Sequence, residues 1–151
     1  MMKIICVGKI KEKFFVNALD EYLKRLTKYT KLEIIELSDE SNGSIEQIID
    51  KESNKILDKI KDEDYVILLD IKGNLLSSEE FADKISLLES KYKNIVFIIG
   101  GSYGVNNKVK DKSNMLLSFS KMTFPHQLMR VILSEQIYRC YRIIANEPYH
   151  K

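Results

Sequence analysis

Two polar segments follow apolar runs near the centre of this chain, and their residue types are those of ligand-binding loops. The run 95–99 leads into Gly100-Gly101-Ser102-Tyr103-Gly104, and the apolar residues 115–117 lead into the segment 118–126, which reads SFSKMTFPH. In an open α/β sheet, ligands bind outside the carboxyl ends of parallel strands, where backbone amides and carbonyls are still unpaired. We therefore take these two segments as the candidate site.

The residue pattern argues against several kinds of chemistry. Gly100, Gly101 and Gly104 do not fit the dinucleotide motif G-x-G-x-x-G, and no phosphate loop G-x-x-x-x-G-K-[ST] follows a strand. The only histidines, His126 and His150, have no clustered cysteine or carboxylate partners, so no metal site is expected. No serine lies in the G-x-S-x-G turn of a hydrolase. For the glycine pair, a plain turn and a close approach of a ligand both stay open.

Strands and helices alternate along the chain, in the order needed to bring these segments together. Apolar runs predict strands over 3–8, 32–37, 65–71, 95–99 and 115–120, with a turn at Lys72-Gly73-Asn74. Helical spacing predicts helices over 14–29, from a Ser44 cap to about residue 60, from a Ser77 cap to about residue 92, over 107–112 and over 126–145. This alternation predicts an α/β fold with a mainly parallel sheet and flanking helices.

The last predicted helix, 126–145, is apolar on nearly all sides. Its polar residues form only a narrow stripe of Glu135, Arg139 and Arg142, continued by Asn146. A helix that is apolar on most sides must be covered on most sides. We therefore expect burial within the subunit and against a second copy, in a two-fold homodimer.

Length and composition predict one soluble, cytoplasmic domain. A chain of 151 residues can bury about two thirds of its unfolded surface. No stretch approaches the roughly 18 apolar residues of a membrane span, and the first apolar run, 4–7, is too short for a signal peptide. Cys6 and Cys140 lie in apolar surroundings, so we expect both to be buried and reduced.

The net charge of +2 is distributed unevenly along the chain. Residues 1–31 carry eight basic and three acidic side chains, residues 32–90 carry six and sixteen, and residues 91–151 carry ten and three. If the chain ends fold together, one surface is basic and suits an anionic partner such as RNA. Charged blocks are also commonly solvated surfaces, so charge alone leaves RNA binding open.

Three segments together carry a resemblance to a known family. They are 96–104, the loop 118–126 and the tail Asn146-Glu147-Pro148-Tyr149-His150, with further matches at Val7-Gly8-Lys9, Glu21-Tyr22 and Leu69-Asp70. On these segments, and over its whole length, the chain resembles the ribosomal RNA large subunit methyltransferase H family of the SPOUT class. The resemblance implies one SPOUT domain over 1–151, an α/β-knot fold with a deep C-terminal trefoil knot over about 66–151, and a homodimer.

The resemblance also implies an activity and a set of cofactor contacts. Family members use S-adenosylmethionine, bound in the knot, to methylate N3 of the pseudouridine at position 1915, in helix 69 of the 23S ribosomal RNA. Carried over by position, the cofactor contacts are Leu69, Gly100, Phe119, Ser120, Lys121, Met122, Thr123 and Phe124. Judged from the residues alone, the apolar members of this set equally suit ordinary core packing. Neither a metal nor a membrane is expected to take part.

Transfer of a methyl group to N3 needs alignment, loss of the N3 proton and a means of stabilising the anion that forms. Tyr149 and His150 are catalytic candidates if the tail folds over the site. Arg139 and Arg142 are candidates for binding a phosphate or the anionic base, and Arg139 is also a catalytic candidate. Other interpretations stay open, because Arg139 has helix ion-pair spacing from Glu135 and chain ends are commonly disordered. We expect His126 to be structural.

Two other functions remain open for this sequence. A noncatalytic RNA- or ribosome-binding module on the same fold would bind RNA without any effect of the cofactor and would yield no methylated product. A small-molecule enzyme would be stabilised by ATP or a dinucleotide and not by S-adenosylmethionine. Free RNA, the large subunit and the assembled ribosome are all candidate substrates.

Overall fold

The computed structural model describes every residue from Met1 to Lys151. The strands are β1 (Met2–Val7), β2 (Leu32–Leu37), β3 (Tyr65–Leu75), β4 (Ile95–Ile99) and β5 (Met115–Ser118). The helices are α1 (Lys13–Leu26), α2 (Ile45–Leu57), α3 (Ser78–Glu89), α4 (Asn107–Lys112) and α5 (His126–Ile144). The alternation of strands and helices that the sequence predicts is confirmed.

The five strands form one parallel sheet in the order β2-β1-β4-β3-β5. Every residue of β1 and β4 is buried, as expected for near-continuous apolar strands that helices cover on both faces. Because all the strands run in the same direction, the loops after β3, β4 and β5 leave the same edge of the sheet. The predicted α/β class with a mainly parallel sheet and flanking helices is confirmed.

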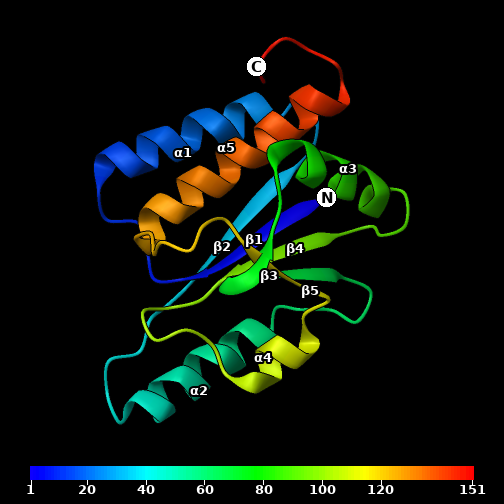
Figure 1. Cartoon of the computed structure of the whole chain (residues 1–151). Helices are drawn as coiled ribbons and strands as arrows, with labels where there is room; N and C mark the ends of the chain where they lie inside the picture. The colour runs from blue at the N-terminus through cyan, green and yellow to red at the C-terminus, as the bar shows by residue number, and fades with distance from the viewer.

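Helices cover both faces of this sheet, with α1, α3 and α5 on one face and α2 and α4 on the other (Figure 1). Alternate residues of β1 divide between the two resulting cores, because successive side chains of a strand point to opposite faces. Ile4 and Cys6 belong to the core under α1, α3 and α5, whereas Ile5 and Val7 belong to the core under α2 and α4. None of the helices combines the length and the apolar character that a membrane crossing requires.

The two serine caps predicted from sequence are both present as reciprocal capping boxes. Ser44 Oγ accepts a hydrogen bond of 3.2 Å from the Gln47 amide, and Gln47 Oε1 accepts one of 2.9 Å from the Ser44 amide. Ser77 and Glu80 do the same at the start of α3. Each box satisfies two amides that the first turn of a helix leaves free. Both helices end about three residues earlier than predicted, at Leu57 and Glu89.

The end of β3 differs from the prediction. The segment Lys72-Gly73-Asn74, predicted as a turn, belongs to the strand, and both Leu69 and Asn74 pair with Leu117 of β5 across an irregular stretch. A Cβ atom on Gly73 would lie 2.6 Å from the carbonyl carbon of Leu116. The glycine is therefore required by the close approach of two backbones and not by a turn. β5 ends at Ser118, two residues earlier than predicted.

Helix α5 packs against α1 and α3 and is buried along much of its length (Figure 1). Leu133, Ile137 and Cys140 are almost inaccessible to solvent, so the predicted burial of this helix within the subunit is confirmed. Cys6 and Cys140 are buried free thiols, also as predicted. Burial raises the pKa of Cys6 to about 11 and that of Cys140 to about 12. The trefoil knot implied by the resemblance stays a prediction.

Candidate functional site

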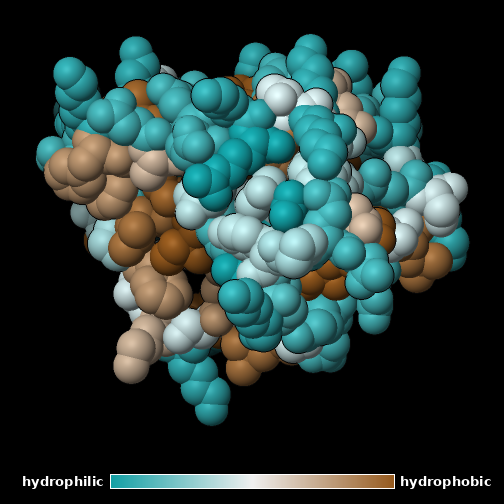
Figure 2. Space-filling model, turned by 90° about the horizontal axis from the view of Figure 1, so that it is seen from above, coloured by the Kyte–Doolittle hydropathy of each residue, from teal (hydrophilic) through white to brown (hydrophobic).

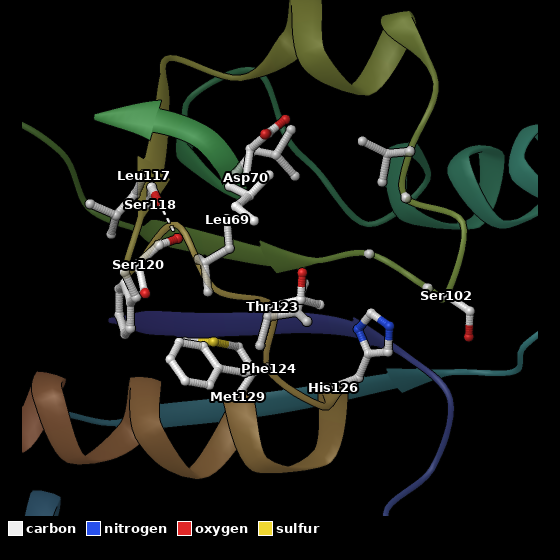
Figure 3. A pocket seen from close by; sticks show the side chains of 18 of the residues that line it. Leu69, Asp70, Ser102, Leu117, Ser118, Ser120, Thr123, Phe124, His126 and Met129 are labelled. Atoms are coloured by element: carbon white, nitrogen blue, oxygen red, sulfur yellow. Dashed lines mark hydrogen bonds between the residues drawn. The ribbon is translucent and has the colours of Figure 1, made fainter. Parts of the chain in front are cut away.

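A cavity of about 390 Å³ opens at the carboxyl ends of β3, β4 and β5 (Figure 3). Its lining consists of Leu68 to Ile71, Ile99 to Val105, Lys110, Leu117 to Ser120, Met122 to Phe124, His126 and Met129. Cavities of roughly 300–1,000 Å³ commonly hold small organic ligands. The two segments singled out in the sequence therefore meet, and the end of β3 joins them.

The cavity has an apolar side and a polar side. In Figure 3, Leu69, Phe124 and Met129 lie together on one side, whereas Thr123, His126 and Ser102 lie toward the other. Apolar walls can hold a flat ring, and a few polar groups fix its orientation. The arrangement therefore suits a ligand that has both an aromatic part and polar groups.

The turn after β4 needs its glycines for two physical reasons. Gly104 has a φ of +82°, a backbone conformation that L side chains rarely adopt. At Gly100 a Cβ would lie 2.9 Å from Val105 Cγ1, and at Gly101 it would lie 2.5 Å from Glu52 Oε1. The turn is therefore packed tightly against the protein behind it, while its other side forms part of the cavity wall.

Helix α2 supports this turn from behind. Ser53 Oγ accepts a hydrogen bond of 3.0 Å from the amide of Asn106, and the Asn106 side chain donates one of 3.1 Å to Asp50. Between these two residues of α2, the buried side chain of Glu52 lies against Gly101. This support could not be predicted from the sequence, because its contacts join segments about 50 residues apart and leave no local pattern.

The loop after β5 is held by hydrogen bonds from its own serines. Ser118 Oγ donates to the carbonyl of Ser120 at 2.9 Å, and Ser120 Oγ accepts from the amide of Met122 at 3.0 Å. Seven of the eight residues predicted to contact the cofactor line the cavity. The exception is Lys121, whose exposed side chain lies outside the lining.

The start of α5 is tied to the end of β1 by a buried arginine. Arg130 is 1% exposed; it donates hydrogen bonds to the carbonyls of Val7 and Gly8 at 2.9 and 2.8 Å and pairs with Glu36 at 2.9 Å. This anchor fixes the point at which the loop 118–126 rejoins the core. His126, one turn earlier, lines the cavity, although the sequence predicted only a structural role. Burial, followed by the charge of Arg130, lowers the pKa of His126, so its ring is neutral at neutral pH.

The predicted catalytic residues Arg139, Tyr149 and His150 form a separate group with two glutamates that the sequence did not single out as catalytic, Glu79 and Glu135. We call these five residues the tail cluster. Arg139 pairs with Glu135 at 2.6 Å, and the Tyr149 hydroxyl donates to the same carboxylate at 3.0 Å. His150 lies 3.1 Å from Arg139 through Nδ1 and 2.5 Å from Glu79 through Nε2. The tail is therefore held against α5, and the helix ion pair considered for Arg139 is present.

No residue of the tail cluster lines the cavity in a single chain. A smaller cavity of about 230 Å³ lies beside the main one and shares Leu117, Phe119 and Phe124 with it. Arg142, the other predicted substrate contact, is also engaged, since it pairs with Glu147 at 2.8 Å and donates to the Tyr29 hydroxyl at 3.3 Å. The tail therefore does not close over the cavity of its own chain.

The surroundings of the tail cluster alter its ionisation. Burial, together with the hydrogen bond to Glu135, raises the pKa of Tyr149 to about 12. The hydrogen bond from His150 lowers the pKa of Glu79. Tyr149 is therefore a protonated hydrogen-bond donor at neutral pH and does not act there as a base. No group of three His, Cys, Asp or Glu side chains that could hold a metal ion occurs in the chain.

The fold and the cavity together define the class of protein. It is an α/β protein with a cavity at the carboxyl ends of three parallel strands, built by the three loops that follow them and without a phosphate-binding motif. Residues 1–150 match the family model described as "Predicted SPOUT methyltransferase". The chain belongs to the SPOUT methyltransferase family.

Full-length relatives agree with this assignment. The chain is 56% identical to a protein from Clostridium novyi, over 98% of both chains. It is 54% identical to one from Clostridium botulinum strain Okra, over 99% of both chains, and 49% identical to one from Caldicellulosiruptor saccharolyticus, over 100% of both. All three are named ribosomal RNA large subunit methyltransferase H. The resemblance inferred from the two loops and the tail is confirmed.

Proposed function

We propose that this protein transfers a methyl group from S-adenosylmethionine to N3 of the pseudouridine at position 1915, in helix 69 of 23S ribosomal RNA. The observation that carries the proposal is the convergence of the ends of β3, β4 and β5 around one cavity, with seven of the eight predicted cofactor residues in its wall. The names of the full-length relatives support the substrate class. We further propose that it acts in the cytoplasm, as a single knotted domain over 1–151 with the knot over about 66–151.

The cavity suits this cofactor by its shape and its chemistry. Its apolar side can enclose an adenine ring, and the backbone of the loop 118–124 can form hydrogen bonds with the edge of that ring. Gly100 and Gly101 contribute backbone atoms to the cavity wall, and a Cβ on either would clash with Val105 or Glu52. We propose that Leu69, Gly100 and the cavity-lining residues of the segment 119–124 bind the cofactor.

When bound, the cofactor supplies a methyl group on a positively charged sulfur. In the transfer, the N3–carbon bond forms as the carbon–sulfur bond breaks, its electron pair stays on sulfur, and the N3 proton leaves the base. The protein's main contribution is alignment, because an in-line displacement depends on the relative placement of its two reactants. We propose that three side chains of the tail cluster exchange their present partners for the substrate: Tyr149 then donates its hydrogen bond to the target base and not to Glu135, His150 leaves Glu79 and receives the N3 proton, and Arg139 stabilises the developing anion.

We propose that a homodimer completes the site, because the tail cluster does not line the cavity of its own chain. Figure 2 shows the face that carries α1, α3 and α5, with an apolar patch over the amino-terminal ends of α1 and α5. Phe14 of α1 is 62% exposed, and Met122, just before α5, is 75% exposed. A self-complementary contact here would cover these side chains and bring a second chain close to the cavity mouth.

Basic residues beside the cavity support an RNA substrate. The loop after β1 reaches the start of α5, where the amide of Lys11 donates to Gln127 Oε1 at 3.0 Å. The side chains of Lys9, Lys11 and Lys13 are exposed in this region, and so is that of Lys121 in the adjoining loop. Lysines in such a place can neutralise phosphates and orient an RNA on the surface.

The direct test is methyl transfer from labelled S-adenosylmethionine to large subunits and ribosomes that lack this modification, followed by mass spectrometry of the nucleosides. We expect wild-type protein to form N3-methylpseudouridine. Tyr149→Phe, His150→Ala and Arg139→Ala variants are expected to lose activity while retaining cofactor binding. Wild-type protein that binds the cofactor but leaves both substrates unmethylated would refute the proposed activity.

One observation favours a second function, that of a noncatalytic ribosome-binding module. In a single chain the tail cluster is satisfied by its own hydrogen bonds and lies apart from the cavity. This alternative predicts RNA binding that does not depend on the cofactor, and no methylated product. Calorimetry with S-adenosylmethionine separates the two, since the proposed enzyme must bind it and the binding module need not.

A further inference from the structure

Glu52 is a buried acidic side chain that the steps proposed above do not use. It lies within α2 and is 3% exposed. Its Oε2 accepts a hydrogen bond of 3.0 Å from the amide of Glu40, whereas its Oε1 is buried and has no hydrogen-bond partner. No lysine or arginine forms an ion pair with it. A buried carboxylate without a cation is costly, so its missing partner needs an explanation.

The unpartnered oxygen faces the glycine turn of the cavity. A Cβ atom on Gly101 would lie 2.5 Å from Glu52 Oε1 and 3.2 Å from its carboxyl carbon. The carboxylate of Glu52 therefore packs directly against Gly101, and Gly101 itself lines the cavity. The adjacent Ser53 holds the end of the same turn through the amide of Asn106 at 3.0 Å, so the carboxylate is held in place against the turn.

No lysine or arginine side chain pairs with this carboxylate, and Lys110, which also lines the cavity, is exposed to solvent. His126 lines the same cavity. Burial and the charge of Arg130 lower the pKa of His126 by more than the charge of Glu52 raises it, and they leave the ring neutral. Arg130 is itself occupied by Glu36 and two backbone carbonyls. Charges interact more strongly through a protein interior than through water, and salt screens them less. A cation that enters the cavity would therefore be attracted by the negative charge of Glu52.

We propose that Glu52 is a charge-selecting residue of the cofactor site, whose carboxylate behind Gly101 favours the sulfonium of S-adenosylmethionine over the neutral thioether of S-adenosylhomocysteine. The inference rests on the proposed function, because it requires this cofactor in the cavity. Loss of the methyl group removes the positive charge from sulfur and with it this attraction. Glu52 thereby favours binding of the donor and release of the product without touching either.

The test is calorimetry with S-adenosylmethionine and S-adenosylhomocysteine on the wild type and on Glu52→Gln, which keeps the shape and removes the charge. We expect the Kd for S-adenosylmethionine to rise at least five-fold and the Kd for S-adenosylhomocysteine to change less than two-fold. The difference should persist at high salt. Glu46→Gln is the matched control, because it removes the same charge from the exposed first turn of α2 and should leave both Kd values unchanged.

Equal weakening of both ligands would show that Glu52 only shapes the turn, and this result overturns the inference. An unchanged ratio of the two Kd values overturns it as well, while binding of both ligands leaves the proposed function intact. Wild-type protein that binds neither ligand overturns both proposals. If Glu52→Gln fails to fold, Glu52→Met, a neutral side chain of similar length suited to an apolar environment, answers the same question.

Discussion

The Tyr149 hydroxyl donates a hydrogen bond of 3.0 Å to Glu135, and the same carboxylate oxygen accepts a hydrogen bond of 2.6 Å from Arg139. The guanidinium of Arg139 also lies over the Tyr149 ring, 4.8 Å from its centre. One carboxylate in the middle of α5 therefore holds a helix side chain and the end of the chain together. This contact explains why the tail lies against α5.

We predict that Tyr149 titrates late in the folded protein. Burial and the hydrogen bond to Glu135 raise its pKa from 10 to about 12. The stability that this tyrosine contributes is therefore fully present below pH 10 and is lost as the pH rises through about 12. The difference in tyrosinate absorbance between the wild type and Tyr149→Phe should have its midpoint near 12. A midpoint near 10 would show that the hydroxyl is solvated and that the contact does not form.

We predict that Arg130→Met destabilises the fold strongly. The change leaves Glu36 without its cation and the carbonyls of Val7 and Gly8 without their donors. Removing one member of a buried, hydrogen-bonded ion pair typically costs about 3–5 kcal/mol. Because Glu36 keeps some contact with solvent, we expect the lower end of this range in the free energy of unfolding in urea.

The control for Arg130→Met is Arg25→Met. Arg25 pairs with Glu21 one turn earlier on the exposed side of α1. Pairs of this kind contribute little to stability, because water already solvates both charges. A variant of Arg130 that is no less stable than the Arg25 variant would contradict the anchoring role assigned to Arg130.

We predict that Gly73→Ala disturbs the pairing of β3 with β5. The new Cβ would lie 2.6 to 2.7 Å from backbone atoms of Leu116 and Leu117, which cannot move aside as a flexible side chain can. Overpacking of this kind typically costs about 1–3 kcal/mol of unfolding free energy. The neighbouring Asn74→Ala change, at an exposed side chain, should stay within about 0.5 kcal/mol of the wild type. Equal stability of the two variants would argue against the observed approach of the strands.

We predict that Gly101→Ala weakens cofactor binding through Glu52. The added Cβ would meet Glu52 Oε1 at 2.5 Å, so either the carboxylate or the turn must move. We expect S-adenosylmethionine to bind about ten-fold more weakly, which corresponds to about 1.4 kcal/mol. In a Glu52→Ala background the same change should cost much less, and calorimetry on all four proteins measures the coupling. Additive effects would show that the two residues do not clash.

The local features of the fold were predictable because their causes are local. Ser44 and Ser77 each have a hydrogen-bonding partner three residues later, and both form capping boxes. The prediction of a turn at Gly73 was wrong because the cause of this glycine is not local. Its identity depends on Leu116, which is distant in sequence, and a glycine needed for close approach looks the same as one needed for a turn. Glu52 and Arg130 could not be singled out either, because their contacts with Gly101 and with the end of β1 also join residues far apart in the sequence.

The candidate site was predictable to a similar degree. The two strand ends singled out in the sequence do meet, because parallel strands bring their carboxyl ends to one edge. Lys121 fell outside the cavity, since the loop around it is shaped by hydrogen bonds from Ser118 and Ser120 that no periodic pattern reveals. The tail cluster could be assigned only by resemblance, and in one chain it packs on α5 and not over the cavity.

The order of strands in the sheet has a consequence for synthesis of the chain. β1 lies between β2 and β4, and its Met2 pairs with Ile95. A nascent chain can therefore pair only β1 with β2 until residues 95–99 have left the ribosome. The cavity requires still later residues, because its lining extends to Met129. Contacts so distant in sequence slow folding, so newly made molecules should form this cavity only as one of their last steps toward the native state.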